Sequence, residues 1–160
     1  MAEKQTLTRI IAGMGLCSSD QDDALQNLYL KSLNTNETWI TPHVCRAWLI
    51  RVAINECLTL HRKHKAFYRH THQIHQEAVR PEYPSIAQTA AFHEELDIIR
   101  DLLRDMHETL LVPLVLRYFN HMTGQEIAKH LKITPEAVRS RLFQGRLRLA
   151  RQLEEKGVKP

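Results

Sequence analysis

Residues 123–138 read TGQEIAKHLKITPEAV, and this stretch decides the fold of the C-terminal part of the chain. Its first four residues fit a capping box, in which the side chains of Thr123 and Glu126 each bond the other residue's backbone amide at the start of a helix. That helix has room for about two turns before Thr134, which with Pro135 is typical of the start of a second helix. Two helices joined by so short a turn predict a helix-turn-helix.

The second helix of this motif is predicted to enter the major groove of DNA. Residues near its start would face base edges, and later arginines would meet phosphates. The candidate DNA-binding residues are Glu136, Ala137, Arg139, Ser140, Arg141, Gln144 and Arg146. An ordinary antiparallel helix pair with a basic outer face is the alternative interpretation.

The rest of the chain also has the pattern of helices. Only five glycines and six prolines interrupt its 160 residues, and no stretch alternates polar and apolar residues as a strand does. The sequence predicts a short helix over residues 8–17 and a second helix with Asp20 as its N-cap. The apolar face of this second helix is predicted to consist of Leu25, Leu28, Tyr29 and Leu33.

A long helix is predicted from Pro42 to about Lys65, where the apolar periodicity ends. Its predicted buried side consists of Cys45, Leu49, Val52, Ala53, Cys57 and Leu60. Two further helices, over about 92–104 and 107–119, lead into the helix-turn-helix. The predicted fold class is therefore all-α.

Two small helical domains account best for this pattern. We expect one domain over residues 1–65 and another over residues 92–160, joined by a flexible linker over residues 66–91 that is rich in His, Gln, Arg and Pro. Each domain is small enough to bury only about 60% of the surface of its unfolded chain.

The composition is that of an ordinary soluble protein, with 43% apolar and 25% charged residues. It excludes a collagen, a disordered tail and a disulfide scaffold. No uncharged apolar run approaches the roughly 18–20 residues that span a bilayer. The three cysteines are an odd number without C-x-x-C spacing, which favours reduced thiols and a cytoplasmic location.

The charges are distributed in stripes. Residues 51–80 hold 6 basic and 2 acidic side chains, residues 81–110 hold 2 and 7, and residues 135–160 hold 7 and 3. Two basic segments separated by an acidic one favour binding to a polyanion such as DNA. Solvated helix faces with no ligand would give the same stripes.

Three blocks of residues occur in order along the chain. The blocks are DQDDALQNLYLK at 20–31, WLIRVAIN at 48–55 with Arg62 seven residues later, and a set formed by LRYF at 116–119, EIA at 126–128 and VRSRL at 138–142. Together they resemble the motif blocks of bacterial RNA polymerase sigma factors of the extracytoplasmic-function (ECF) group.

The resemblance implies a promoter-specificity subunit that binds core RNA polymerase and directs transcription initiation. In such sigma factors, the acidic helix of region 2 docks on the clamp helices of the polymerase's largest subunit. The matching positions here are Asp22, Asp23, Gln26, Asn27 and Leu30. Carboxylate and amide groups within one or two helical turns can face a basic partner together; capping of the helix start is the alternative role for the acidic residues.

The long helix would contact promoter DNA at the element nearest the start site. Arg51, Asn55, Thr59 and Arg62 are spaced 4, 4 and 3 residues apart, so they form one polar stripe. By the resemblance, this stripe would hold the displaced non-template strand, and the helix-turn-helix, in region 4, would bind the distal element. Thr59 stands where the family customarily has Asp.

The resemblance also implies what the protein does not need. It predicts no covalent chemistry, no cofactor, no metal and no small-molecule substrate, and it adds an anti-sigma protein as a possible partner. The sequence agrees in having no phosphate-binding glycine loop, zinc-protease spacing or nucleophile elbow. The competing hypothesis is a stand-alone helix-turn-helix repressor or activator that acts as a dimer.

Two further features bear on the site. Lys132 stands where the family usually has a turn glycine, and a left-handed backbone there would carry a strain of about 1 kcal/mol. Five histidines lie close together, and they allow a metal site, a pH-dependent basic patch or simply a polar mobile linker. They are His61, His64, His70, His72 and His75.

Overall fold

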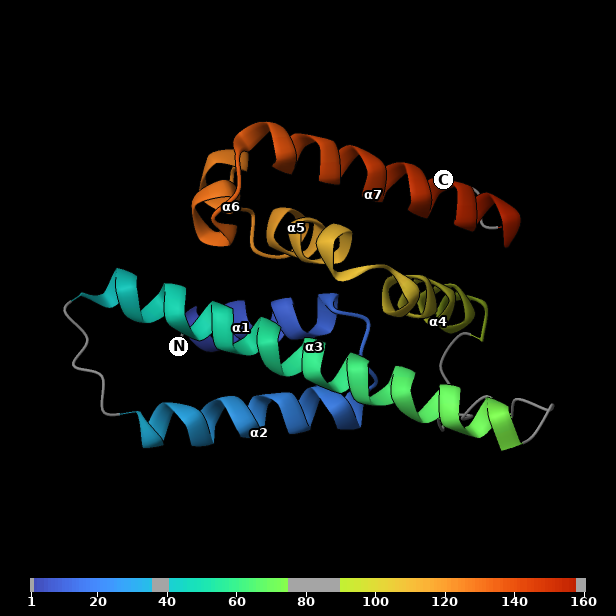
Figure 1. Cartoon of the computed structure of the whole chain (residues 1–160), viewed down its shortest axis with the longest axis horizontal. Coiled ribbons are helices and arrows are strands. Elements are labelled where there is room, and N and C mark those ends of the chain that lie inside the picture. Colours follow the sequence, from blue (N-terminus) through green and yellow to red (C-terminus); the bar gives the residue numbers. More distant parts are fainter. Residues whose placement is uncertain (1, 36–40, 75–89, 158–160) are drawn as a thin grey trace.

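The structure is a computed structural model that describes residues 2–35, 41–74 and 90–157. Every regular element in these ranges is a helix, which confirms the predicted all-α fold. The helices are α1 (Ala2–Gly13), α2 (Ser18–Asn34), α3 (Pro42–Ile74), α4 (Ala90–Asp105), α5 (Glu108–Tyr118), α6 (Gly124–Leu131) and α7 (Pro135–Glu155). Figure 1 shows α2 along one side of the molecule, α1 and α3 next to it, and α5, α6 and α7 on the opposite side.

The N-terminal half is built around α3, which packs against both α1 and α2. Ala24 of α2 and Ala53 of α3 are fully buried, and such small side chains allow two helices to lie close together. Ile10 and Ile11 of α1 are also fully buried in this core. Burial of these apolar side chains is the main source of stability for a helical domain of this size.

The first two helices begin and end at different residues from those predicted. α1 ends at Gly13, and Gly15 takes a positive φ of 75°, so the chain turns before the predicted end of the helix. α2 then begins at Ser18, with Cys17 at the N-cap position. The prediction of Asp20 as N-cap was wrong: Asp20 lies in the first turn, and its carboxylate accepts a hydrogen bond from the Cys17 thiol at 3.0 Å.

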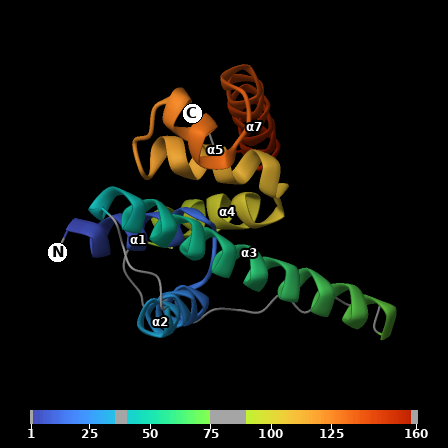
Figure 2. The same cartoon turned by 60° about the vertical axis from the view of Figure 1, so that its left-hand side comes forward.

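α3 begins at Pro42 as predicted but continues to Ile74, about two turns beyond Lys65. The first part of the predicted linker is therefore helical, as the extension of α3 in Figure 2 shows. Residues 75–89 of that linker lie outside the described residues. The apolar periodicity did not reveal the extension, because a helix that continues beyond the core no longer needs an apolar face.

The C-terminal half packs α5 between the helices of the helix-turn-helix and the N-terminal half. The predicted α4 and α5 are confirmed, with His107 accepting a hydrogen bond from the Thr109 amide at the start of α5. Residues 111–116 of α5 are all buried. At Gly145 of α7 an added Cβ would lie 2.7 Å from Leu114, so the absence of a side chain lets α7 cross close to α5.

The two halves meet at the turn between α1 and α2. A Cβ on Gly13 would lie 2.7 Å from the ring of Phe119, and one on Gly15 would lie 2.9 Å from Leu103. An ion pair between Arg62 of α3 and Glu108 of α5, at 2.8 Å, joins the halves at a second point. None of the described helices has the length and apolar character to cross a membrane.

Candidate functional site

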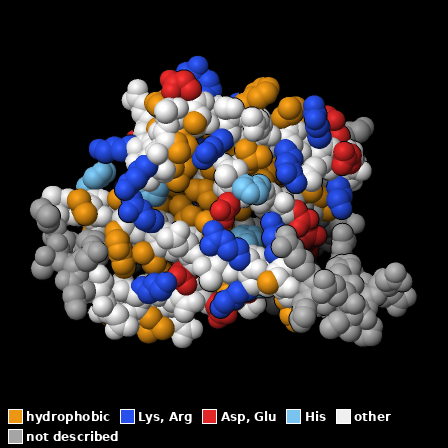
Figure 3. All heavy atoms as spheres, in the orientation of Figure 1, with side chains coloured by type: hydrophobic (Ala, Val, Ile, Leu, Met, Phe, Trp, Pro, Cys, Tyr) orange, Lys and Arg blue, Asp and Glu red, His pale blue; other side chains and the backbone are white. Residues whose placement is uncertain are grey.

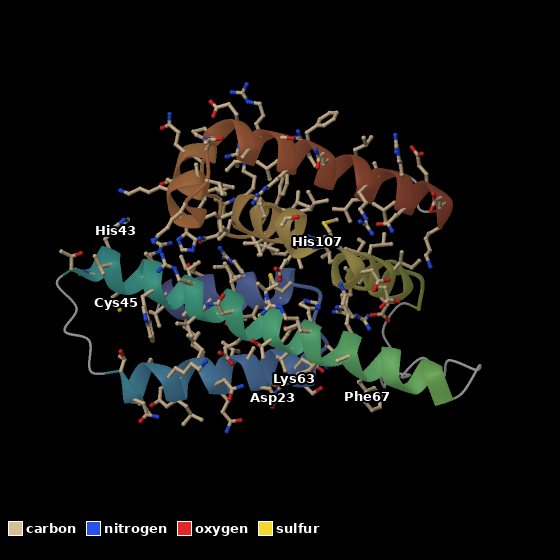
Figure 4. The ribbon with its side chains drawn as sticks, in the orientation of Figure 1. Asp23, His43, Cys45, Lys63, Phe67 and His107 are labelled. Carbon is tan, nitrogen blue, oxygen red and sulfur yellow. The ribbon has the colours of Figure 1, made fainter. Side chains whose placement is uncertain are left out.

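The predicted polymerase-binding residues form an exposed surface on α2. Asp22, Asp23, Gln26, Asn27 and Leu30 are all exposed. Figure 4 shows Asp23 on the side of the molecule opposite α5, α6 and α7. The structure thus brings these five side chains together, as predicted, on a face that nothing else in the described chain covers.

Two residues of the predicted apolar face extend this surface. Tyr29 and Leu33 were placed on that face with Leu25 and Leu28, but 64% and 63% of their surfaces are exposed. The face is only partly covered because α2 is an outer helix, whose buried residues are Ala24 and Leu28. Tyr29 and Leu33 are four residues apart, as are Ala24 and Leu28, but Tyr29 follows Leu28 by one residue and so lies on a different side of the helix. This offset is the sequence signal that could have separated the exposed row from the buried row.

The polar stripe on α3 is exposed as predicted but is not free of the C-terminal half. Arg51 and Asn55 line a cavity between α3 and the helices α5, α6 and α7. Thr59 donates its hydroxyl hydrogen to the backbone carbonyl of Asn55 at 2.8 Å, so it acts within the helix. Arg62 holds Glu108. The stripe is therefore exposed, but Arg51 and Asn55 lie beside the cavity and Arg62 is paired with α5.

The helix-turn-helix has the local structure that its sequence predicts. Thr123 accepts from the Glu126 amide, and the Glu126 carboxylate accepts from the Thr123 amide at 2.7 Å, which completes the capping box. These bonds hold the pKa of Glu126 below its usual value. Thr134 caps α7 by accepting from the Ala137 amide at 3.2 Å.

The turn between α6 and α7 depends on a residue in an uncommon conformation. Lys132 has φ 55° and ψ 46°. This is the left-handed conformation that was considered for it because it stands in the place of a turn glycine. Its amide and that of Ile133 both donate to the carbonyl of Ala128. A left-handed lysine costs about 1–2 kcal/mol that a glycine would not.

The predicted DNA-binding residues of α7 do not share one face. Glu136, Arg139, Ser140, Gln144 and Arg146 are exposed, while Ala137 and Arg141 are half-buried. Arg141 lines the cavity toward α3. Arg146 instead borders a second, apolar cavity between α4, α5 and α7. A DNA duplex on α7 would therefore meet the five exposed side chains directly, and would meet Arg141 only at the edge of the contact.

The cavity between the halves is large and positively charged. Its volume is about 450 Å³, and it lies between α3 on one side and α5, α6 and α7 on the other. Figure 3 shows apolar side chains on the floor of this hollow and Lys and Arg side chains around it. The basic residues of its wall are Arg51, His130, Lys132 and Arg141, and the acidic one is Glu108. Burial and the nearby charge of Arg51 lower the pKa of His130, which favours its neutral form.

The histidines near the end of α3 have separate environments. His61 is buried, and its Nε2 donates to the Met14 carbonyl at 2.8 Å. His64 lies 3.4 Å from the Asp20 carboxylate. No group of three or more His, Cys, Asp or Glu side chains suited to a metal occurs in the described part of the chain. The structure describes no side chains for His70 and His72, and His75 lies outside the described residues, so the metal and linker hypotheses for them stay predictions.

Comparison with known families decides what these surfaces belong to. The family model described as Sigma-70 region 2 matches residues 1–67, and that described as Sigma-70, region 4 matches residues 96–149. Together the matches cover well over half of the chain. The chain belongs to the sigma-70 family. This sigma factor carries the acidic α2 surface and the α3 stripe within its region 2 match, and the helix-turn-helix within its region 4 match.

The fold of this sigma factor is also similar to a solved structure. It matches a chain in the structure of CnrH in complex with the cytosolic domain of CnrY, with a TM-score of 0.66 and 20% sequence identity. The match covers 96% of the present chain and 84% of that chain. At this identity the likeness shows a shared fold. No curated protein matches the sequence of this sigma factor.

Proposed function

We propose that this sigma factor is a promoter-specificity subunit of the ECF group, which binds core RNA polymerase through α2 and promoter DNA through α3 and α7. The observation that carries the proposal is the exposed surface formed by Asp22, Asp23, Gln26, Asn27 and Leu30, with Tyr29 and Leu33 beside it. Exposed apolar side chains next to carboxylates are suited to a basic, partly apolar partner. We assign this partner as the clamp helices of the polymerase's largest subunit.

The position of this surface supports simultaneous binding of polymerase and DNA. α2 lies on one side of the molecule, and the helix-turn-helix on the other (Figures 1 and 2). A polymerase docked on α2 leaves Arg139 and Ser140 of α7 accessible to the distal promoter element.

DNA binding by α3 requires a change in the described arrangement. Arg51 and Asn55 face the cavity, and Arg62 is paired with Glu108 of α5. In this proposal, a non-template strand on the stripe breaks that ion pair and widens the cavity between α3 and the helices α6 and α7. The described structure is in this proposal a closed state of the factor, and polymerase binding opens it.

A regulatory protein partner is also part of the proposal. The similar solved structure contains CnrH bound to the cytosolic domain of another protein, CnrY. We propose that an anti-sigma protein binds the present chain in the same general way.

Promoter-directed transcription by core polymerase tests the assignment of surfaces. Asp23→Arg with Gln26→Ala should abolish core binding and transcription while leaving the unfolding transition unchanged, because both side chains are exposed. The matched control is Asp105→Arg, which makes the same charge reversal at an exposed position on α4 and should leave transcription unchanged. Asn55→Ala should retain core binding and impair promoter opening. Equal core affinity in the double variant and the control would remove α2 from the polymerase interface.

A further inference from the structure

The cavity between α3 and the helix-turn-helix has a property that DNA binding by either half alone does not explain. It brings cationic residues from three different segments to one open hollow of about 450 Å³. Arg51 comes from α3, Lys132 from the turn after α6, and Arg141 from α7. The volume is within the range of sites that hold small ligands, about 300–1,000 Å³.

The charges around this cavity are not neutralised within the described chain. Arg51, Lys132 and Arg141 form no ion pair with any described residue. The carboxylate in the wall, Glu108, is already paired with Arg62 at 2.8 Å. Three like charges held around a common space repel one another, and an anion in that space would convert the repulsion into attraction.

Lys132 is a second, independent indication. Its backbone is in the left-handed region, where glycine is free of strain, yet the chain has a lysine at this position in the lining of the cavity. Strain at a position of this kind is a reason to look for a function of the side chain. Binding of an anion by the ammonium group would be such a function.

The other walls indicate what kind of anion fits. Arginines present forked donors that match phosphate oxygens, and Asn55 and Thr109 add polar groups. Ile54, Leu58 and Val112 form an apolar part of the lining that suits a flat or apolar portion of a ligand. We propose that this cavity binds a small phosphate-bearing anion of the nucleoside phosphate class.

Such a ligand would hold the factor in its closed state. Arg51, Asn55 and Arg141 are both cavity residues and proposed DNA contacts, so ligand and promoter DNA would exclude each other. A ligand that binds the closed state alone stabilises it against opening, and by reciprocity opening weakens ligand binding. This consequence rests on the proposed function, but ligand binding itself does not require it.

Calorimetric titration of the full chain, without DNA or polymerase, tests the proposal. The probes are inorganic pyrophosphate and adenosine diphosphate at constant ionic strength. We expect saturable binding of one molecule per chain for both, with the nucleotide tighter if the apolar wall contributes. Pyrophosphate binding as tight as that of the nucleotide would overturn the assignment to nucleoside phosphates and leave a site for phosphate groups alone.

Two variants distinguish the cavity from general surface charge. Lys132→Gly should weaken binding by about tenfold, as expected for loss of one charge-assisted contact, while its unfolding midpoint without ligand rises because glycine relieves the strain. Lys129→Ala removes an exposed positive charge from α6 outside the cavity and should leave the affinity unchanged. Absence of saturable binding at millimolar probe, or equal weakening in both variants, would overturn the proposal. Since this assay contains no promoter, its failure leaves the transcription test unaffected.

Discussion

Acidification should destabilise this sigma factor through His61. Only 6% of the surface of His61 is exposed, and its Nε2 donates to the carbonyl of Met14 at 2.8 Å. Its Nδ1 is buried and has no hydrogen-bond partner among the described residues. A second proton on the ring would therefore place a charge and an unsatisfied donor in the core.

Several positive groups reinforce this effect. Burial is the main cause that lowers the pKa of His61; the Met14 hydrogen bond opposes it, and Lys65, His64 and Arg104 add to the lowering. Lys65 and His64 lie on the same helix as His61, and Arg104 reaches it from α4. The folded protein therefore keeps this histidine neutral at a pH at which the unfolded chain already binds a proton.

The sign and size of the effect follow from proton linkage. Above the unfolded pKa of about 6.5 both states are neutral, and His61 contributes no pH dependence. Below it the unfolded state binds the extra proton, so the free energy of unfolding falls by up to about 1.4 kcal/mol per pH unit until the folded pKa is reached. The loss occurs between neutral pH and the lowered pKa of the folded state.

Urea unfolding from about pH 7.5 to about pH 5.5 measures this slope. His61→Gln retains an amide donor for the Met14 carbonyl but cannot titrate, so its slope should be smaller by the contribution of one histidine. His43→Gln, at the exposed start of α3, is the matched control and should keep the wild-type slope. Identical slopes for the wild type and His61→Gln would refute the reasoning.

Two other predictions concern helix capping and thiol reactivity. Thr134→Ala removes the side-chain acceptor for the Ala137 amide, so urea unfolding should show that the free energy of unfolding falls by about 1 kcal/mol. Thr134→Ser keeps a hydroxyl acceptor and should retain most of the stability. Equal stability of the two variants would contradict the role of the cap. Burial and the charge of Glu56 raise the pKa of Cys57 to about 12, so in native protein at neutral pH an aromatic disulfide reagent should modify Cys17 and Cys45 and spare Cys57 until denaturant is added. Rapid modification of Cys57 in the native state would show that α3 opens more readily than its burial implies.

The parts of the structure that depend on local rules could be predicted from the sequence. The capping box at Thr123, the N-cap at Thr134 and the start of α3 at Pro42 each depend on a few adjacent residues. The exposed position of the α2 acidic residues also followed from helical spacing. A helix terminus has few alternatives for its unpaired amides, so side chains that satisfy them mark its position.

The parts that depend on distant segments could not be predicted in this way. The sequence placed one face of α3 in the core, but Ile50, Ile54, Glu56 and His61 are buried as well, because other helices pack on more than one side of α3. Glu56 is accommodated there by its ion pair with Lys31 of α2 at 2.5 Å. The cavity joins α3 to residues about 80 positions further along the chain, and no local pattern specifies that meeting.

Co-elution with bacterial core RNA polymerase on size exclusion tests the central claim most directly. The account predicts a stoichiometric complex, formed by the wild-type chain and by Asp105→Arg but not by the Asp23→Arg and Gln26→Ala double variant. A wild-type chain that stays separate from core polymerase and elutes as a dimer would contradict the account. That result would favour a helix-turn-helix regulator that acts on DNA without polymerase.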